Sequence, residues 1–110
     1  MSIDKEIGAR VRVLREGSKN EDGRKLTLRN VAEALDMSHT FIGDLERGDK
    51  RWLFEYVEKF ADYYNVPASL LTDPSIPLEQ IQQIAEILEE LSELPSDKLA
   101  AILQMLRAMK

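Results

Sequence analysis

Apolar residues recur at helical spacing along most of the chain, and short polar or proline-containing stretches separate the apolar runs. This pattern predicts an all-α protein. The expected helices cover residues 4–16, two short segments within 27–48, and then 53–65, 78–92 and 97–108. Each has one apolar face, and helices this short cannot bury that face without a neighbour.

The clearest boundary is the stretch 73–77, where two prolines fall within four positions. It divides the chain into a first domain, residues 1–72, a proline-containing linker, 73–77, and a tail, 78–110. The two tail helices are expected to form an αα-hairpin, which is too small to hold a core of its own. The hairpin must pack on the first domain or on a second copy. We expect a dimer interface at its apolar positions, Ile81, Ile84, Leu88, Leu91, Leu99, Ile102, Leu103 and Leu106.

The first predicted helix has an apolar stripe that should face the core, made by Ile3, Ile7, Val11 and Leu14. Asp4 is the expected N-cap, and Arg10 and Arg12 are expected to point away from the core. In the helix over 53–65, several aromatic residues lie off the inward stripe. We expect Trp52, Phe54, Tyr56 and Tyr63 to form an exposed aromatic surface.

The stretch 27–48 has the pattern of two short helices with a tight turn between them. Thr27 and Ser38 are N-cap candidates, because each hydroxyl can accept a backbone N–H bond. Asp36 stands at the turn, and aspartate is among the few residues other than glycine that tolerate a positive φ. Gly48 suits a helix C-terminus.

This stretch resembles the helix-turn-helix of the phage repressor/Cro-like (XRE-type) family of DNA-binding proteins. The resemblance rests on Ala32 at the small position, Ile42 and Leu45 at the core positions, and the ending Glu46-Arg47-Gly48. It implies a five-helix lambda-repressor-like domain, with a short fifth helix over 66–71. The chain departs from the family at Asp36, where glycine is usual, and at Leu28, where a phosphate-binding glutamine is frequent.

The resemblance also implies site residues on the second helix of the motif. The expected base contacts are His39, Thr40, Gly43 and Asp44, and the expected phosphate contacts are Thr27, Ser38, Arg47, Lys50 and Arg51. Asp44 could instead form a surface ion pair with Arg47, and His39 could be an ordinary solvated side chain. A structural ion pair is expected between Arg15 and Glu46.

The polar stretch 17–25 is longer than the usual family connection. One interpretation is that Lys19, Arg24 and Lys25 reach the DNA backbone. The other is a mobile, solvated loop, which the acidic residues at its tip favour.

Charge and composition narrow the function further. The formal charge of −5 disfavours indiscriminate nucleic-acid binding, but residues 73–110 carry three bases and seven acids, so the first domain is near neutral. The chain has no cysteine and one histidine, so we expect no disulfide, no metal site, no cofactor and no enzymatic activity. The absence of a membrane span or signal peptide predicts a cytoplasmic protein with no membrane partner.

The sequence thus predicts a transcriptional regulator, most simply a repressor, that binds an inverted repeat in double-stranded DNA as a homodimer. Two alternatives stay open. One is an antitoxin-type autorepressor with a toxin or antirepressor as protein partner. The other is a protein-interaction module that has the fold without binding DNA.

Overall fold

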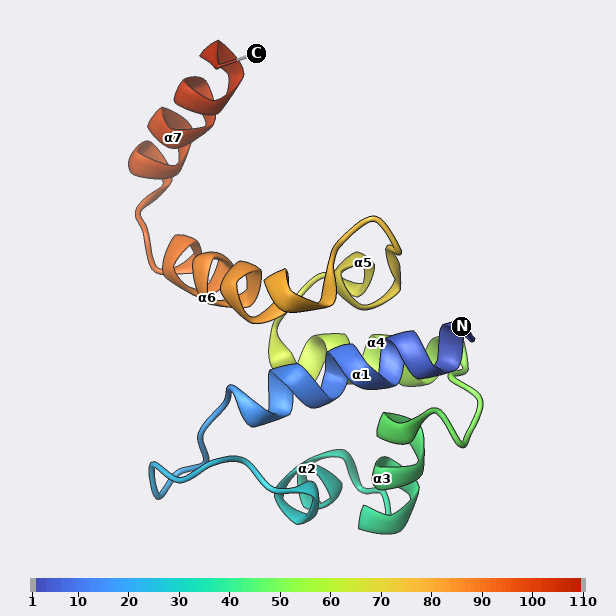
Figure 1. Cartoon of the computed structure of the whole chain (residues 1–110). Coiled ribbons are helices and arrows are strands. Elements are labelled where there is room, and N and C mark those ends of the chain that lie inside the picture. The colour runs from blue at the N-terminus through green and yellow to red at the C-terminus, as the bar shows by residue number, and fades with distance from the viewer. Residues whose placement is uncertain (1, 110) are drawn as a thin grey trace.

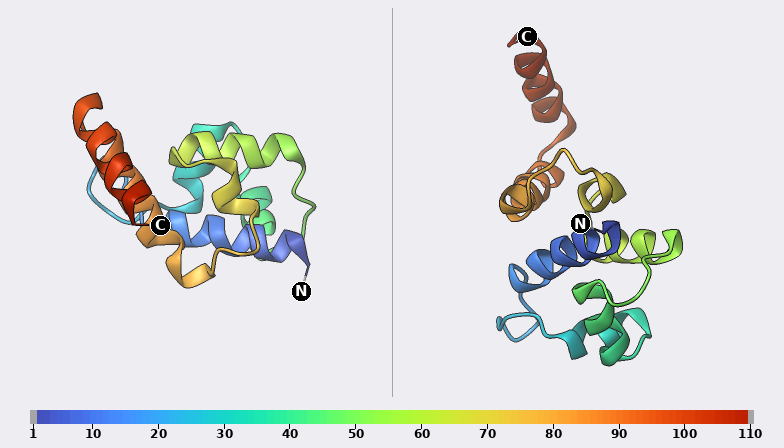
Figure 2. Two further views of the ribbon diagram at one scale, coloured as in Figure 1. Left: turned by 90° about the horizontal axis from the view of Figure 1, so that it is seen from above. Right: turned by 45° about the vertical axis from the view of Figure 1, so that its right-hand side comes forward.

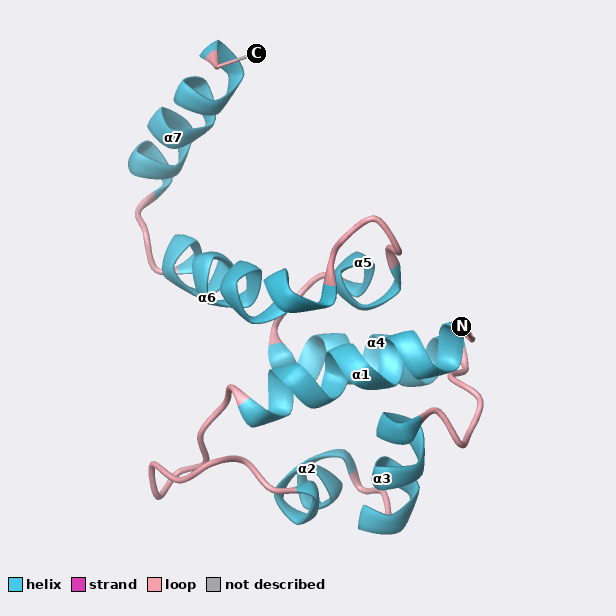
Figure 3. Ribbon diagram, viewed as in Figure 1, coloured by secondary structure: helices cyan, strands magenta, loops and turns pink. Residues whose placement is uncertain are grey.

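A computed structural model describes residues 2–109, and within that range it is built from helices joined by loops (Figures 1 and 3). The elements are α1 (Ile3–Glu16), α2 (Leu28–Leu35), α3 (His39–Arg47), α4 (Phe54–Tyr64), α5 (Ala68–Thr72), η1 (Leu78–Gln80), α6 (Ile81–Ser92) and α7 (Ser96–Ala108). The all-α class, with five helices followed by two, is confirmed. None of the helices within residues 2–109 is both long and apolar enough to cross a membrane.

The start of α1 differs from the expectation. Ser2 is the N-cap and accepts a bond from the backbone N–H of Lys5. Asp4 accepts instead from the backbone N–H of Trp52, at 2.8 Å, and so ties α1 to the segment that follows α3. Ile3 is 50% exposed and does not belong to the core. It is the first residue of α1.

The residues that begin and end α2 and α3 are those expected from the sequence. Thr27 and Asn30 form a reciprocal capping box at α2, and Ser38 caps α3 by accepting from the backbone N–H of Phe41. Asp36 ends α2 in the left-handed conformation, with φ 55°, and Gly48 ends α3 with φ 77°. The aspartate thus provides the turn for which the family uses glycine.

The core surrounds α1, which lies between the α2–α3 pair on one side and α5 with α6 on the other (Figures 1 and 2). Its buried apolar residues are Ile7, Val11, Leu14, Leu26, Val31, Ala32, Leu35, Ile42, Leu45, Trp52, Val57, Phe60, Ala61, Val66, Leu70, Leu71 and Ile81. At Gly8 the two helices α1 and α3 approach so closely that a Cβ atom would clash with the carbonyls of Leu45 and Glu46.

The tail does not behave as one hairpin. Ile81 is fully buried in the core of the first domain, so α6 packs against α1 rather than on a partner. In Figure 1, α7 leaves the body of the molecule instead of folding back along α6, and none of its residues from 96 to 108 is buried. The assignment of Ile81 to a dimer interface is therefore wrong, because an apolar stripe does not reveal which partner covers it.

Arg10 also differs from the expectation. It is buried, with 5% of its surface exposed, and its guanidinium donates to the carbonyl of Leu71 at 3.1 Å and of Ile76 at 2.8 Å. These bonds join α1 to Leu71, just before the proline-containing linker, and to Ile76 within it. The linker is thereby held against α1 shortly before η1 and α6 begin.

The expected aromatic surface is largely absent. Trp52 is buried, with its ring edge-on to Phe60, and its indole N–H donates to the carbonyl of Leu45 at 2.9 Å. Tyr56 packs edge-on against Phe41. Phe54 remains 72% exposed.

The stretch 17–25 is a structured turn rather than an open excursion. Lys19 and Lys25 form an isolated antiparallel bridge. Within the turn, the Asn20 side-chain oxygen accepts from the backbone N–H groups of Asp22 and Arg24. The Asn20 amide donates to the Asn30 side chain, so the turn leans on the start of α2.

Candidate nucleic-acid interface

The first turn of α3 is accessible to solvent. α2 and α3 lie at the end of the molecule opposite α6 and α7 (Figure 1). His39 and Thr40 are exposed at the start of α3, while Ile42 and Leu45 face the core. This division leaves two polar side chains next to each other at the N-terminal end of the helix, where its partial positive charge lies.

A capping hydroxyl stands at the N-terminus of each of the two helices. Thr27 and Ser38 are both exposed, and each accepts a backbone N–H bond from its own helix. The hydroxyl hydrogen of each is then still available as a donor. An anion at either helix N-terminus would therefore meet an O–H group together with backbone N–H groups. Arg29, in the first turn of α2, adds an exposed cation beside Thr27.

Arg47 is engaged by carboxylates on both sides. Its guanidinium donates to Asp44, three residues earlier, and to Asp49 at 3.0 Å. The bond to Asp49 and the charges of the two carboxylates raise the pKa of Arg47 above its ordinary value. Of the two interpretations for Asp44, the structure shows the ion pair in the isolated chain. These bonds use Nε and one of the two terminal nitrogens of the guanidinium.

Gly43 is covered by neighbouring side chains in the isolated chain. It is buried, and a Cβ atom there would lie 3.2 Å from the Arg47 guanidinium and 3.6 Å from a methyl group of Leu28. This arrangement also accounts for the departure at Leu28, because its half-buried side chain packs over Gly43 between α2 and α3. Both covering groups are side chains, so the approach of Gly43 to a base edge stays a prediction.

Lys50 and Arg51 are exposed just after α3, and the segment that carries them is fixed at both ends. Gly48 ends α3 so close to α1 that a Cβ atom there would clash with Lys5. At the other end, Trp52 is held through its backbone by Asp4 and through its indole by the carbonyl of Leu45. The two cations are thus presented by a short, well-held connection.

Arg15 and Glu46 form the expected ion pair. The guanidinium donates to both carboxylate oxygens, at 2.8 and 3.0 Å, and the side chains are 12% and 5% exposed. A further bond runs from Arg15 to the carbonyl of Leu26. The bond to Glu46 raises the pKa of Arg15. The pair joins α1 to the last turn of α3 and to the segment before α2.

Several residues that position the interface were missed or misplaced by sequence reasoning. Gly8 carried a usable signal, because glycine inside a helix is costly unless another backbone approaches. Trp52 and Asp4 gave no signal for their mutual bond, since they are 48 residues apart. Within residues 2–109, no three His, Asp or Glu side chains gather as metal ligands would.

The expected dimer positions of the tail divide into two groups. Ile84, Leu88 and Leu91 on α6 are half-buried, and Ile102 on α7 is half-buried as well. Leu99, Leu103 and Leu106 on α7 are 37%, 47% and 56% exposed. The free apolar surface of the tail is thus concentrated on α7.

A family model described as a helix-turn-helix domain matches residues 6–73 of the chain. The matched region runs from α1 through the residue after α5, and it contains α2, α3 and the basic segment that follows. No curated protein and no solved structure matches the chain.

Proposed function

Because the chain belongs to the helix-turn-helix domain family, we propose that it is a sequence-specific transcriptional regulator that acts as a repressor. The observation that supports this most is the exposed first turn of α3. There His39 and Thr40 are exposed directly after the capping residue Ser38, and Lys50 and Arg51 are exposed just after the other end of the same helix.

In the proposed complex, α3 enters the major groove with its first turn toward the base edges. Thr40 bonds a base edge or places its methyl group against thymine, and His39 donates or accepts at a neighbouring base. Asp44 accepts from a cytosine amino group after Arg47 has turned from it toward a phosphate. Thr27, Ser38, Arg47, Lys50 and Arg51 bind phosphates, which sets the register of the domain on the duplex.

We further propose that the regulator acts as a homodimer on an inverted repeat. None of the residues from 96 to 108 is buried, and α7 presents an apolar stripe to solvent. A helix of this length is marginal in water without tertiary contacts, so its apolar face favours a partner. In Figure 2, α7 lies away from α3, so a dimer formed there leaves the first turn of α3 free.

The test is selection from a random-sequence duplex library with the full chain at moderate salt, followed by sequencing of the retained duplexes. The proposal predicts enrichment of an inverted repeat whose half-site centres are about 34 Å apart, one turn of DNA. Retention without enrichment would contradict sequence-specific regulation.

Two charge-reversal variants with the same net charge distinguish the loss of local phosphate contacts from the effect of total charge on DNA binding. Lys50→Glu with Arg51→Glu is expected to abolish retention, because both cations lie beside the phosphates. Lys59→Glu with Arg12→Glu makes the same change of charge at exposed positions on α4 and α1, and should retain most of the binding. Equal losses in both variants would show that only net charge matters.

A protein-interaction module on the same fold is the second candidate. Two observations favour it: Leu28 packs against Gly43 where the family frequently has a phosphate contact, and Arg47 is bound to two carboxylates. This candidate predicts no retention of any duplex, even at low salt.

A further inference from the structure

Only part of the apolar surface of α6 packs on the first domain. Ile81 is buried in the core, and Ile84 packs against it. Farther along the helix, Ile87 is 49% exposed, and Leu91 and Leu94 are half-buried without belonging to the core. The positions 84, 87, 91 and 94 follow one another at intervals of three, four and three residues, so they share one side of the helix. We call these four residues the α6 stripe.

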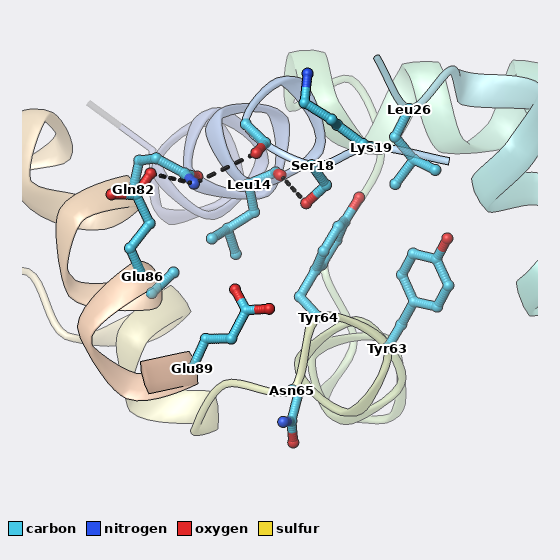
Figure 4. Close-up of a pocket in the computed structure, with 12 residues that line it drawn as sticks. Leu14, Ser18, Lys19, Leu26, Tyr63, Tyr64, Asn65, Gln82, Glu86 and Glu89 are labelled. Carbon is cyan, nitrogen blue, oxygen red and sulfur yellow. Dashed lines mark hydrogen bonds between the residues drawn. The ribbon is translucent and has the colours of Figure 1, made fainter. Parts of the chain in front are cut away.

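The opposite side of α6 faces a cavity. Glu86 and Glu89 line this cavity, which has a volume of about 590 Å³ and lies beside the C-terminal ends of α1 and α4 (Figure 4). Successive residues of an α-helix are turned by about 100°, so Ile87 and Leu91 lie on the side of α6 away from the cavity. The α6 stripe is thus separate from the cavity and is accessible to another helix at Ile87.

α7 carries a stripe with the same spacing. Leu99, Ile102, Leu106 and Met109 also follow one another at intervals of three, four and three residues, and we call them the α7 stripe. None of the residues from 96 to 108 is buried, and Met109 is 79% exposed. Two helices pack with interlocking side chains when both have this alternation of three and four. The two stripes have equal length, so one can cover the other from end to end.

The charges of the two helices are complementary. Within α6 all charged residues are acidic, whereas α7 has two basic residues and one acidic residue. Glu90 borders the α6 stripe, and Lys98 borders the α7 stripe. A contact of α6 with α6 would bring carboxylates together, and a contact of α7 with α7 would place the more basic helix against itself. Charge therefore favours a contact between α6 and α7.

The connection between α6 and α7 carries α7 away from the stripe of its own chain. In Figure 1 and in the right-hand view of Figure 2, α7 extends outward from the end of α6 rather than along it. Only residues 93–95 join the two helices, and Pro95 is extended, with φ −61° and ψ 154°. A short connection that directs a helix outward favours exchange of that helix between two copies of a chain.

We propose that two copies of the chain exchange their α7 helices, so that each α7 stripe lies antiparallel on the α6 stripe of the other copy. In this alignment Ile87 faces Leu106 of the partner subunit, and Leu91 faces Ile102 of the partner subunit. The contact occurs twice about a two-fold axis and forms a bundle of four helices. It rests on the homodimer proposed above, but it joins α6 to α7 rather than α7 to α7.

Crosslinking through engineered cysteines tests the exchange, because the chain has no cysteine of its own. Ile87→Cys and Leu106→Cys are made in separate full-length chains, one of them with a mass tag, and the two are refolded together and oxidised without DNA. The exchange predicts a disulfide-linked dimer that contains one chain of each variant, because facing side chains of packed helices come within disulfide range. In the control, Glu86→Cys on the cavity side of α6 replaces Ile87→Cys and should give little of this product.

Analytical ultracentrifugation of single variants gives a second measurement. Ile87→Glu places a carboxylate in the proposed contact, so it should weaken dimerisation at least about tenfold although it lies outside α7. Ser92→Glu adds the same charge at an exposed position of α6 outside the stripe and should leave the dimer intact. Circular dichroism should show that both variants remain folded, because both positions are exposed in the single chain.

Three results would overturn the exchange. If both cysteines in one chain form a disulfide within that chain and the product is a covalent monomer, α7 folds back on its own α6. If Leu106→Cys chains crosslink with one another while Ile87→Glu remains a dimer, the homodimer stands and its contact is α7 with α7. If the unmodified chain is a monomer at every concentration, the proposed homodimer fails together with the exchange, whereas DNA recognition is decided separately by the duplex library.

Discussion

At the scale of single residues, the Arg15–Glu46 pair is a point at which one substitution should be costly. Both side chains are removed from water, and they satisfy each other with two bonds. Loss of one partner leaves an uncompensated charge in the interior, which costs more than the pair contributes when it is intact.

We therefore expect Glu46→Ala to lower the free energy of unfolding by about 3 kcal/mol. The exposed pair of Arg12 and Glu16, with side chains 59% and 43% exposed, provides the comparison. Glu16→Ala should cost less than about 0.5 kcal/mol. Urea denaturation of both variants at one protein concentration measures the difference. Equal losses would show that Glu46 is effectively solvated.

The buried bonds of Arg10 lead to a second prediction for a single residue. Methionine at position 10 fills much of the same space but leaves the carbonyls of Leu71 and Ile76 without their donor. Arg10→Met should lower the free energy of unfolding by about 2 kcal/mol, because bonds to charged donors are among the stronger ones. It should also accelerate hydrogen exchange of the amides in α6. Arg12→Met, on the exposed side of α1, is the control. Unchanged exchange in α6 would mean that its packing does not depend on Arg10.

These residues also show what a sequence pattern leaves open. Arg15 could be placed because a family motif supplies its partner, whereas nothing in the chain links Arg10 to carbonyls more than sixty positions away. A long side chain beside an apolar stripe has the same pattern whether it extends into water or bends over a neighbouring segment. Trp52 shows a related limit, because its burial depends on the space that α1, α3 and α4 leave between them.

At the scale of elements, the turn between α2 and α3 is determined by local chemistry. Asp36 occupies the left-handed region at φ 55°, which costs a residue with a Cβ atom about 1–2 kcal/mol unless its side chain tolerates it. The sequence alone was sufficient to predict this turn, since helix caps and turn residues depend on near neighbours in the chain. The same holds for Thr27, Ser38 and Gly48, whose bonds lie within their own helices.

We expect Asp36→Ala to lower the free energy of unfolding by about 1 kcal/mol, because alanine lacks the tolerance of aspartate for positive φ. Asp36→Gly should cost nothing or stabilise the domain. Glu33→Ala, on the exposed face of α2, is the matched control and should change little. Thermal or urea unfolding distinguishes these outcomes. A loss with glycine as large as with alanine would mean that the aspartate carboxylate, not its conformation, matters at the turn.

At the scale of the whole molecule, the tail divides into a part that belongs to the first domain and a part that does not. Periodicity predicted both helices, but it could not tell which of them packs on the domain, because an apolar stripe does not show which surface covers it. The difference depends on the linker, which is bound to α1 and directs α6 back along the domain.

This division predicts how the tail responds to substitution. Leu103→Glu with Leu106→Glu should convert a dimer into a monomer in analytical ultracentrifugation and weaken operator binding by roughly a hundredfold, through loss of bivalency. Ala101→Glu with Gln104→Glu places the same number of carboxylates on the opposite side of α7 and should leave the dimer intact. A monomer in both the unmodified chain and the control would contradict the proposed homodimer.

The bonds from Arg10 to the linker bear on how the two halves of an operator are spaced. A flexible tether would let two domains adjust to half-sites at varied separations, with an effective concentration that falls slowly with distance. Arg10 instead holds Leu71, before the linker, and Ile76, within it, so α6, from which α7 extends, is held at a set angle to its domain. One inserted base pair turns the second half-site by about 35°. Affinity should therefore fall steeply with that insertion, and Arg10→Met should make the dependence on spacing shallower.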